Sequence, residues 1–524
     1  MMKKTMKQYS FASQLKSLAV VFGIALTFAS CAKEDVAQNP SNKEGDNDKN
    51  LTTFVAGEEA KTRTSLDYNS SDFSWEAGDY IYVKDDDGVM RKSTNAPTQK
   101  VASFRYRVPG KFGASASYKV YYLGKNSNGS QVTISANQTQ TAPDNTEHFG
   151  TAGDYGTATA TGAVGGSIFS FVLEHQPAYL VFQPYTSNTI LHNCYLTGVE
   201  VTSDNDIAET YTVNTSTGAL TGSAGSKQIV LRTRGSGSYY NGFPLTNNTA
   251  SVATNGAYMV IKPGTHTLRV RYWVKDVATN VEGTITKTLP ATAYASNTYY
   301  DMTANLNVRK YDGDKYYMWD AQEQYWKGHE WNLGGSQPTL TTQSASSDYP
   351  QNSSDLNNRW YNESYPGYGI SNPAIHSCKD LLNVNGMTWY AAKGEPRWDG
   401  DELWTTMGHL YKGGMWFKKK SQISGYNSNT DYDGTDWRTT SKSKNWSVSH
   451  TLPSAADANK YFYLPALGYY TSGRLMNLGG AGHYWSSSAI SWGRGYAAYM
   501  YFRSGYVSVN FSSRDVGFWV GGFE

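Results

Sequence analysis

Cysteine, net charge and long hydrophobic runs are all scarce in this sequence of 524 residues. There are only three cysteines, Cys31, Cys194 and Cys378, so we expect the folds to depend on packing rather than on disulfides. Lys and Arg number 46 and Asp and Glu 44, which gives a net charge of +2. Because no basic stripe accompanies a nucleic-acid-binding motif, we expect no nucleic-acid partner. After Cys31 no apolar run is long enough to cross a membrane.

The usual motifs of catalysis and metal binding are also missing. The sequence has no His-Glu-x-x-His, no Cys-x-x-Cys, no Gly-x-Ser-x-Gly elbow and no phosphate-binding loop. We therefore expect a protein that is not an enzyme and that has no cofactor and no metal. One alternative stays open, because an acidic cluster could supply the two carboxylates of a glycoside hydrolase. That cluster consists of Glu395, Asp399, Asp401 and Glu402, and it is also typical of the start of a surface helix.

A second acidic segment has the spacing of a calcium loop. Asp431, Asp433 and Asp436 surround Gly434, but the closing bidentate glutamate of such loops is missing. We interpret the segment as a solvated turn.

The N-terminus predicts export and lipidation. Four lysines precede the apolar run 18–28, and small residues lead directly to Cys31. The run is too short for a permanent membrane helix and is typical of a lipoprotein signal peptide, residues 1–30. Cys31 is the predicted lipidation (palmitate) site, and residues 32–35 resemble the acidic signal that sends some lipoproteins of Gram-negative bacteria to the outer face of the outer membrane. The polar residues 31–50 are predicted to form a flexible tether.

What the sequence has in abundance is aromatic residues and glycine: 15 Trp, 41 Tyr and 50 Gly, with short apolar runs between turns. This composition predicts a mainly β protein. Between residues 51 and 310 we expect two β-sandwiches, 51–185 and 186–310. Strands are predicted at 118–122, 170–173, 178–182, 228–231 and 267–274, the last with Leu268, Val270, Tyr272 and Val274 on one face.

Two segments of this region resemble the fimbrillin family of pilus subunits. They are the Thr-Arg-Thr segment around Arg63 and the Trp-x-x-Gly-Asp-x-Ile pattern of residues 75–81. The pattern predicts that Trp75 and Ile81 are core residues joined by a turn at Gly78. The resemblance implies a lipidated subunit that is cut after an N-terminal strand and pairs with other fimbrial subunits by donor-strand insertion. Since about two hundred residues follow, we expect a chain that accepts a strand and does not donate one, as a fimbrial tip requires.

The composition changes again beyond a predicted connector, residues 311–330. Helices are predicted at 372–382 and 388–393, with a helical turn at 401–407. Residues 463–469, 482–488, 499–502 and 514–518 resemble an α+β C-type-lectin-like domain of the kind found in bacterial surface proteins and in variable proteins diversified by retroelements, here 331–524. In diversified members the varied positions alternate through the C-terminal hairpin, and active diversification of this chain is a hypothesis.

The C-terminal hairpin also predicts a binding face. Along residues 506–512, Val507, Val509 and Phe511 alternate with Tyr506, Ser508, Asn510 and Ser512, so one face packs and the other is free. A one-residue shift in register would exchange Tyr501 and Phe502, so which of them points outward stays open. Tyr, Trp and Arg provide contact area and charge, while Ser and Asn adjust their hydrogen bonds. The predicted ligand-binding residues are Trp492, Arg494, Tyr496, Tyr501, Arg503, Tyr506, Ser508, Asn510, Ser512 and Asp515.

These patterns together predict a surface-exposed, outer-membrane lipoprotein that binds a glycan or a protein, most simply as a fimbrial tip adhesin. Three alternatives stay open: a glycan-binding lipoprotein outside any filament, a carbohydrate-active surface hydrolase, and a domain that acts only as a cap or spacer.

Overall fold

The computed structural model describes residues 8–10, 51–57, 65–66, 68, 73–125, 127, 129–214, 219–277, 280–364, 374–440, 442–490 and 493–524. Cys31, Arg63 and Trp492 lie outside these residues, as do the predicted signal peptide and tether apart from residues 8–10. Within the described residues no helix has the length and hydrophobicity needed to cross a membrane.

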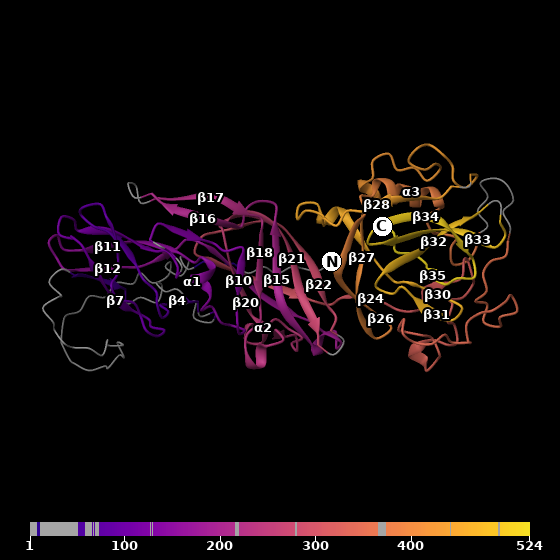
Figure 1. Ribbon diagram of the computed structural model, residues 1–524, viewed down its shortest axis with the longest axis horizontal. Helices are drawn as coiled ribbons and strands as arrows, with labels where there is room; N and C mark the ends of the chain where they lie inside the picture. The colour runs from indigo at the N-terminus through magenta and orange to yellow at the C-terminus, as the bar shows by residue number, and fades with distance from the viewer. Residues whose placement is uncertain are drawn as a thin grey trace, which may run out of the picture. The chain divides into compact units, whose positions relative to one another are not determined.

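The chain is mainly β and divides into two compact units. The first comprises Met1–Tyr272 and Leu289–Leu306, and the second Trp273–Thr288 and Asn307–Glu524. Figure 1 shows the first unit from indigo to magenta and the second largely from orange to yellow. The further division of the first unit into sandwiches at residue 185 stays a prediction.

Three sheets and two smaller strand pairings build the first unit. One sheet has the order β6 (Met90–Lys92), β5 (Tyr82–Lys84), β8 (Ser117–Tyr122), β11 (Gly156–Gly162), β12 (Ile168–Phe171), β2 (Leu51–Ala56) and β7 (Phe104–Pro109), with β13 (Glu174–His175) beside β11. Another has the order β1 (Gln8–Ser10), β23 (Thr298–Asn305), β14 (Ala178–Tyr185) and β20 (Ala257–Ile261).

The remaining strands of this unit pair as follows. A third sheet joins β10 (Asn137–Thr139), β18 (Gln228–Arg232), β15 (Cys194–Ser203), β21 (Gly264–Asp276) and β22 (Glu282–Tyr294), with β19 (Phe243–Pro244) beside β15. Residues 273–276 of β21 and 282–288 of β22 belong to the second unit. Smaller pairings join β17 (Leu220–Ser226), β16 (Ala208–Val213) and β9 (Gln131–Thr133), and also β3 (Ser65–Leu66) and β4 (Phe73–Ser74). Two single-turn helices are α1 (Phe149–Ala152) and α2 (Val252–Asn255), and 3₁₀ turns occupy Leu191–Asn193 and Gly237–Tyr239.

The sequence patterns of the first unit are confirmed by these strands. Each of the predicted runs contributes to a strand: β8, β12, β14, β18 and β21. Trp75 and Ile81 are fully buried, and Gly78 takes a positive φ of 82° in the turn between them. The alternating residues of β21 are buried as expected, at 2% exposure or less for Leu268, Val270, Tyr272 and Val274.

In the second unit, one mixed sheet carries the C-terminal hairpin. Its order is β25 (Tyr316–Tyr317), β35 (Phe518–Trp519), β32 (Ala481–Ala489), β33 (Tyr496–Arg503), β34 (Tyr506–Ser513) and β28 (Lys444–Ser447). Strands β32 and β35 are parallel, and the other pairs of this sheet are antiparallel. The other strands are β24 (Arg309–Tyr311), β26 (Arg397–Thr406), β27 (His409–Lys418) and β29 (Tyr461–Pro465), with the small pair β30 (Tyr469–Thr471) and β31 (Arg474–Met476). The helix α3 (Val384–Lys393) and 3₁₀ turns at Trp331–Leu333, Lys420–Gln422 and Ala458–Lys460 complete the unit.

The segment predicted as a connector, 311–330, is part of the core of the second unit. Its residues 316 and 317 form β25, which pairs with β35. Tyr316, Trp319, Tyr325 and Trp326 are each fully buried. Because burial of large aromatic rings is favourable, these rings pack against the available sheet edge and do not remain in solvent.

Only one of the three predicted helical segments is a helix. Residues 388–393 lie inside α3, whose N-cap Asn383 accepts a hydrogen bond from the Gly386 N–H. The predicted turn at 401–407 is wrong, because its residues through Thr406 belong to β26 and Leu403 pairs with Lys412 of β27. The acidic start resembled a helix N-terminus, yet strand pairing buries Leu403 and Trp404.

The predicted helix at 372–382 is also absent from its described part, residues 374–382, which form turns. The buried carboxylate of Asp320 accepts hydrogen bonds from the backbone N–H groups of Ile375, His376 and Cys378, at 2.8, 2.9 and 3.0 Å. A side chain that captures three successive donors in this way competes directly with helical hydrogen bonding.

Candidate ligand-binding face

The hairpin of β33 and β34 has one register, which fixes its two faces. Tyr499 pairs with Asn510, Tyr501 with Ser508 and Arg503 with Tyr506. Residues opposite one another in an antiparallel pair point to the same side of the sheet. We call the side that carries these three pairs the open face and the other side the closed face.

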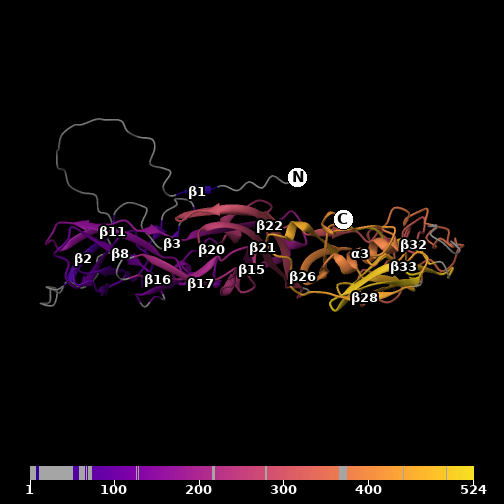
Figure 2. The same cartoon turned by 90° about the horizontal axis from the view of Figure 1, so that it is seen from above.

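The closed face packs into the core of the second unit beneath α3. Met500, Phe502, Val507 and Val509 are fully buried, and they belong to the same cluster as Met387 of α3. Figures 1 and 2 show α3 lying over the sheet that contains β32, β33 and β34. The predicted burial of Val507 and Val509 is therefore confirmed, Phe511 is only half-buried, and Phe502 is the residue that points inward.

The open face carries a row of aromatic rings that ends in a cation. The Tyr501 and Tyr506 rings are 5.6 Å apart, and the Arg503 guanidinium lies 4.7 Å from the centre of the Tyr506 ring. On the other side, His483 of β32 lies 4.8 Å from the Tyr501 ring. Contact between the rings holds these side chains in place, so an amphipathic surface is already formed before any ligand arrives.

Burial along this row rises from the hairpin tip toward β32. Arg503 is exposed, Tyr501 and Tyr506 are half-buried, and His483 is only 6% exposed. Burial raises the pKa of Tyr501, with a further increase from its hydrogen bond with Tyr506, and raises that of Tyr499 to about 12. Burial also lowers the pKa of His483 to about 3. At neutral pH these side chains are uncharged, which leaves Arg503 as the charge at this end of the row.

The structure spreads the predicted contact residues over several environments. Asn510 and Ser512 are half-buried on the open face, whereas Ser508 is 2% exposed, between the larger Tyr501 and Asn445 across its strand pairs. Ser508 therefore offers little area to a ligand. The predicted residues at the opposite end of the hairpin from Arg503 are all exposed: Arg494, Tyr496 and Asp515.

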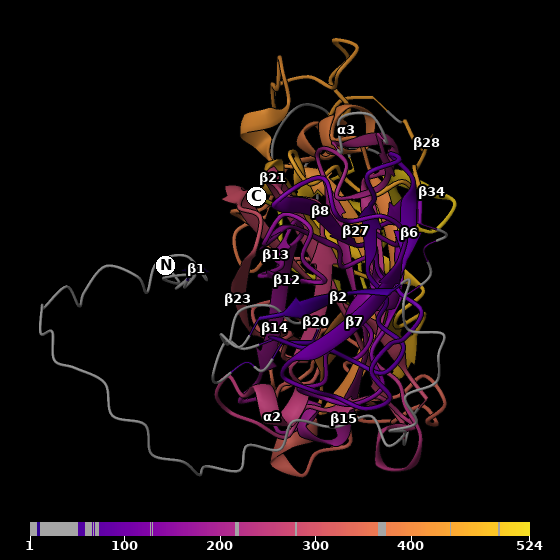
Figure 3. The ribbon, with the colours of Figure 1, turned by 90° about the vertical axis from the view of Figure 1, so that its left-hand side faces the viewer.

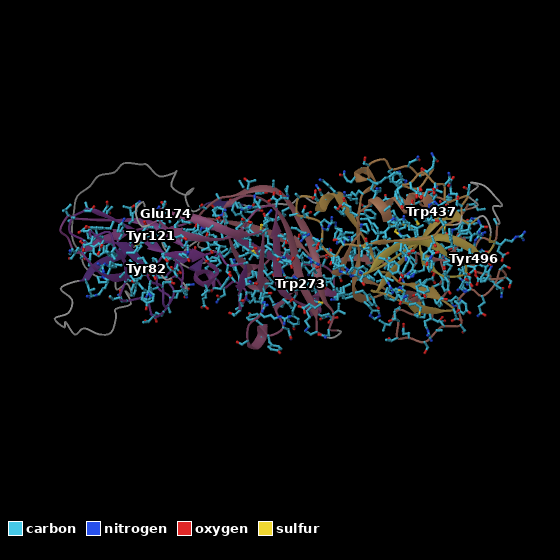
Figure 4. The ribbon with its side chains drawn as sticks, turned by 45° about the horizontal axis from the view of Figure 1, so that its top comes forward. Tyr82, Tyr121, Glu174, Trp273, Trp437 and Tyr496 are labelled. Carbon is cyan, nitrogen blue, oxygen red and sulfur yellow. The ribbon has the colours of Figure 1, made fainter. Side chains whose placement is uncertain are left out.

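Tyr496 is the most exposed aromatic of this hairpin, at 51%. Figure 4 labels it at the edge of the yellow sheet, away from Trp437, which packs near α3. Asp515 accepts a hydrogen bond from the Ser513 hydroxyl. The predicted residues thus form two groups along one hairpin: Arg503 with Tyr506 and Tyr501 at the tip, and Arg494, Tyr496 and Asp515 at the base.

One residue that holds this site lies in the segment 514–518 of the lectin-like resemblance but was not among the predicted ligand-binding residues. Arg514 is fully buried, with its guanidinium 4.3 Å from the Trp319 ring, and it donates to the carbonyl oxygens of Tyr496, Asn362 and Ser364 at 2.9, 2.6 and 2.9 Å. Burial lowers its pKa to about 10. Arg514 therefore fixes the base of the hairpin, and nothing in its sequence context distinguishes it from the exposed Arg503.

The four carboxylates considered for hydrolysis are each engaged in local contacts. Glu395 accepts hydrogen bonds from Tyr461, Lys418 and Arg397, and these contacts lower its pKa to about 2. Asp399 accepts from the Trp416 indole, and Glu402 accepts from the Thr286 hydroxyl.

Asp401 contacts Lys412 at 3.3 Å. A general acid at neutral pH requires a raised pKa, whereas the pKa of Glu395 is lowered.

The acidic segment at Asp431 forms a turn. Its carboxylate accepts hydrogen bonds from the backbone N–H groups of Asp433 and Thr435 and from the Trp437 indole. Among the residues that the structure describes, no group of three or more His, Cys, Asp or Glu side chains is arranged to hold a metal ion.

Comparisons with known proteins give only remote similarities. No family model matches the chain, and a search of curated proteins finds no match. Among solved structures, a protein from Bacteroides ovatus described as a cell adhesion protein is 15% identical, covering 49% of this chain and 93% of its own, with a TM-score of 0.30. The fimbrial anchor protein Mfa2 from Porphyromonas gingivalis is 13% identical, with coverages of 46% and 83% and a TM-score of 0.22.

A fimbrial protein from Bacteroides ovatus matches over more of the chain. It is 11% identical, covers 87% of this chain and 99% of its own, and has a TM-score of 0.22. Because these identities are 15% or lower and the TM-scores 0.30 or lower, neither the folds nor the roles of these proteins are transferred to this chain.

Proposed function

We propose that this protein is a cell-surface adhesin whose activity is binding without turnover, and that it binds a glycan or protein through the open face of β33 and β34. The observation that carries the proposal is the row of contacting rings that ends at Arg503. Tyr501 and Tyr506 offer contact area to a ligand, and their side chains need no further ordering on binding. Arg503 adds a positive charge at the exposed end of the row. Rigid aromatics with a cation at one edge are typical of residues that dominate binding energy.

The exposed base of the hairpin extends this surface. Tyr496 contributes an exposed ring, and Arg494 and Asp515 contribute charges of opposite sign. A ligand that covers the whole hairpin would contact both groups. We propose that the tip residues provide the affinity and that the base residues set the specificity.

We further propose that the chain is anchored in the outer membrane by lipid on Cys31 and faces outward, most simply at a fimbrial tip. The support is the sequence: the basic, apolar and small-residue pattern that leads to Cys31, and the polar residues 31–50 that follow it.

Strand exchange with another fimbrial subunit is proposed from the position of β2. This strand lies between β12 and β7, and Phe54 and Ala56 are fully buried. The Phe54 ring lies 5.1 Å from Phe112 and 5.5 Å from Phe169. Figure 3 shows β2 beside β7. Removal of β2 by a cut at Arg63 would open two strand edges and an apolar site, which a neighbour's strand with an aromatic residue in place of Phe54 would fill.

The test is binding of the full chain to a broad panel of glycans, mucins and cell-surface proteins, beside the double variant Arg503→Ala and Tyr506→Ala. We expect saturable binding that the double variant loses while its melting temperature stays within a few degrees of the wild type. Binding that survives in the double variant would contradict the proposed site. Release of sugar from a bound glycan would favour the hydrolase alternative, and a lack of binding across the panel would favour the cap or spacer.

A further inference from the structure

The second unit contains a cavity of about 440 Å³ that is separate from the open face. Its walls are the strands β24, β29 and β35 together with Tyr484, Lys419 and the last residues of the described chain. This volume falls within the range of roughly 300–1,000 Å³ that is usual for small-molecule sites. None of the ten residues predicted for ligand binding lines it.

Aromatic residues make up half of the residues that line the cavity, and Phe462 is one of them. They come from elements that are far apart in the sequence: Tyr311, Tyr461, Tyr463, Tyr484 and Trp519. The Tyr311 and Trp519 rings are 5.9 Å apart and nearly perpendicular, so these two present different surfaces to the space between the walls. Flat rings of this kind pack against the apolar C–H faces of a sugar ring.

Two hydrogen-bonding groups in this wall have no partner within the described part of the chain. The Trp519 side chain is 95% buried (5% exposed), yet its indole N–H donates no hydrogen bond, and the Tyr311 hydroxyl is likewise unpaired. The other tyrosines are engaged, since Tyr461 donates to Glu395 and Tyr484 donates to the Pro465 carbonyl at 2.7 Å each. Both groups are accessible from the cavity, so each can form a hydrogen bond with a ligand hydroxyl.

The charges at the cavity favour an anion. Arg309 and Lys419 both line it, and each has only a long contact with a carboxylate: 3.4 Å from Arg309 to Glu402 and 3.8 Å from Lys419 to Glu524. Charge-assisted hydrogen bonds are normally about 2.7–2.9 Å long, so neither cation has a close carboxylate partner, although Arg309 also lies over the Trp416 and Tyr463 rings. Glu524 is the one acid among the lining residues, against two cations.

From these observations we propose that the cavity is a second binding site, for a saccharide unit that carries a carboxylate, such as a uronic acid. The aromatic walls receive the sugar ring, Trp519 and Tyr311 hydrogen-bond to its hydroxyls, and Arg309 and Lys419 bind the carboxylate. This site is independent of the proposed open-face site and is not affected if that proposal fails.

The test uses the full chain with glucuronic acid and glucose as probes, which share a ring and differ in the carboxylate. Titrations monitored by saturation-transfer NMR and by calorimetry should show saturable binding of glucuronic acid. The affinity for glucose should be at least about tenfold lower. Lys419→Met and Arg309→Met should each weaken glucuronic acid binding by about tenfold, the effect of losing one charge-assisted contact. Trp519→Phe keeps an aromatic ring, although a smaller one, removes the N–H and should weaken the binding of both probes.

Two matched controls keep the result interpretable. Lys420→Met removes the neighbouring positive charge, which does not line the cavity, and should leave binding unchanged. The double variant Arg503→Ala and Tyr506→Ala should also leave it unchanged. The proposal is overturned by a lack of saturable binding to either sugar, by equal binding of the two, by full binding in Lys419→Met, or by loss of binding in the open-face variant alone.

Discussion

The two faces of the β33–β34 hairpin use the same kind of residue in opposite ways. On the closed face, Phe502 is fully buried in the core beneath α3. On the open face, Tyr501 and Tyr506 are half-buried and touch mainly each other and Arg503. The comparison teaches that aromatic content alone does not locate a binding surface. What distinguishes the open face is that its rings pack along the sheet and leave one side of the row accessible.

The largest effect should come from the closed face. Phe502→Ala removes a buried ring and leaves a cavity, so we expect a loss of about 3–5 kcal/mol in the free energy of unfolding. Tyr501→Ala, one position earlier and half-buried, should cost roughly 1 kcal/mol or less. Chemical denaturation of both variants measures the difference. Equal losses would mean that the two faces are not distinct.

The two arginines of the hairpin region provide the next comparison. Arg514→Met leaves three backbone carbonyl oxygens without their donor in a buried place, so we expect a loss of about 2–4 kcal/mol. Arg503→Met changes an exposed side chain and should stay within about 0.5 kcal/mol of the wild type. Thermal unfolding of both variants measures the two losses of stability. A larger loss in Arg503→Met would contradict the structural role of Arg514.

His483 links the stability of the sheet to pH. Its folded pKa of about 3 lies below the unfolded value of about 6.5, so between these values the unfolded chain binds more protons. The contribution of neutral His483 to the free energy of unfolding is therefore complete above pH 6.5. It falls by at most about 1.4 kcal/mol for each pH unit as the pH drops toward 3. His483→Gln should flatten the stability profile in this window. His450→Gln, at an exposed position where the ring contacts the Ser504 carbonyl, is the matched control.

An unchanged slope in His483→Gln would show that the buried histidine does not carry this pH dependence. Acid unfolding curves of the wild type and both variants, measured at constant ionic strength, separate this contribution from that of the carboxylates.

The alternation of residues in the sequence was enough to predict two of the buried residues of β34, although Ser508 is also buried and Phe511 is only half-buried. Val507 and Val509 are in the core as expected, because a period of two over one strand fixes its faces. The alternation could not show which of Tyr501 and Phe502 points outward, since both are large aromatics in a run without polar residues. The pairing of Tyr501 with Ser508 resolves this.

Other features depended on contacts distant in the sequence. The helical turn predicted at 401–407 is strand, because pairing with β27 buries Leu403 and Trp404. Ser508 looked accessible from its residue type, but larger neighbours across the strands cover it. The role of Arg514 depends on carbonyl groups about 150 residues away in the sequence. No local pattern encodes such contacts.

The most direct test of the central claim is an alanine scan of the hairpin in which stability and binding are measured on the same preparations of the full chain. We predict two separate groups. The protein should lose stability when alanine replaces a closed-face residue: Met500, Phe502, Val507 or Val509. It should stay folded but lose binding to the ligand found in the panel when alanine replaces an open-face residue: Tyr501, Arg503, Tyr506 or Asn510. Losses of binding that simply follow losses of stability across all eight positions would contradict an adhesive open face.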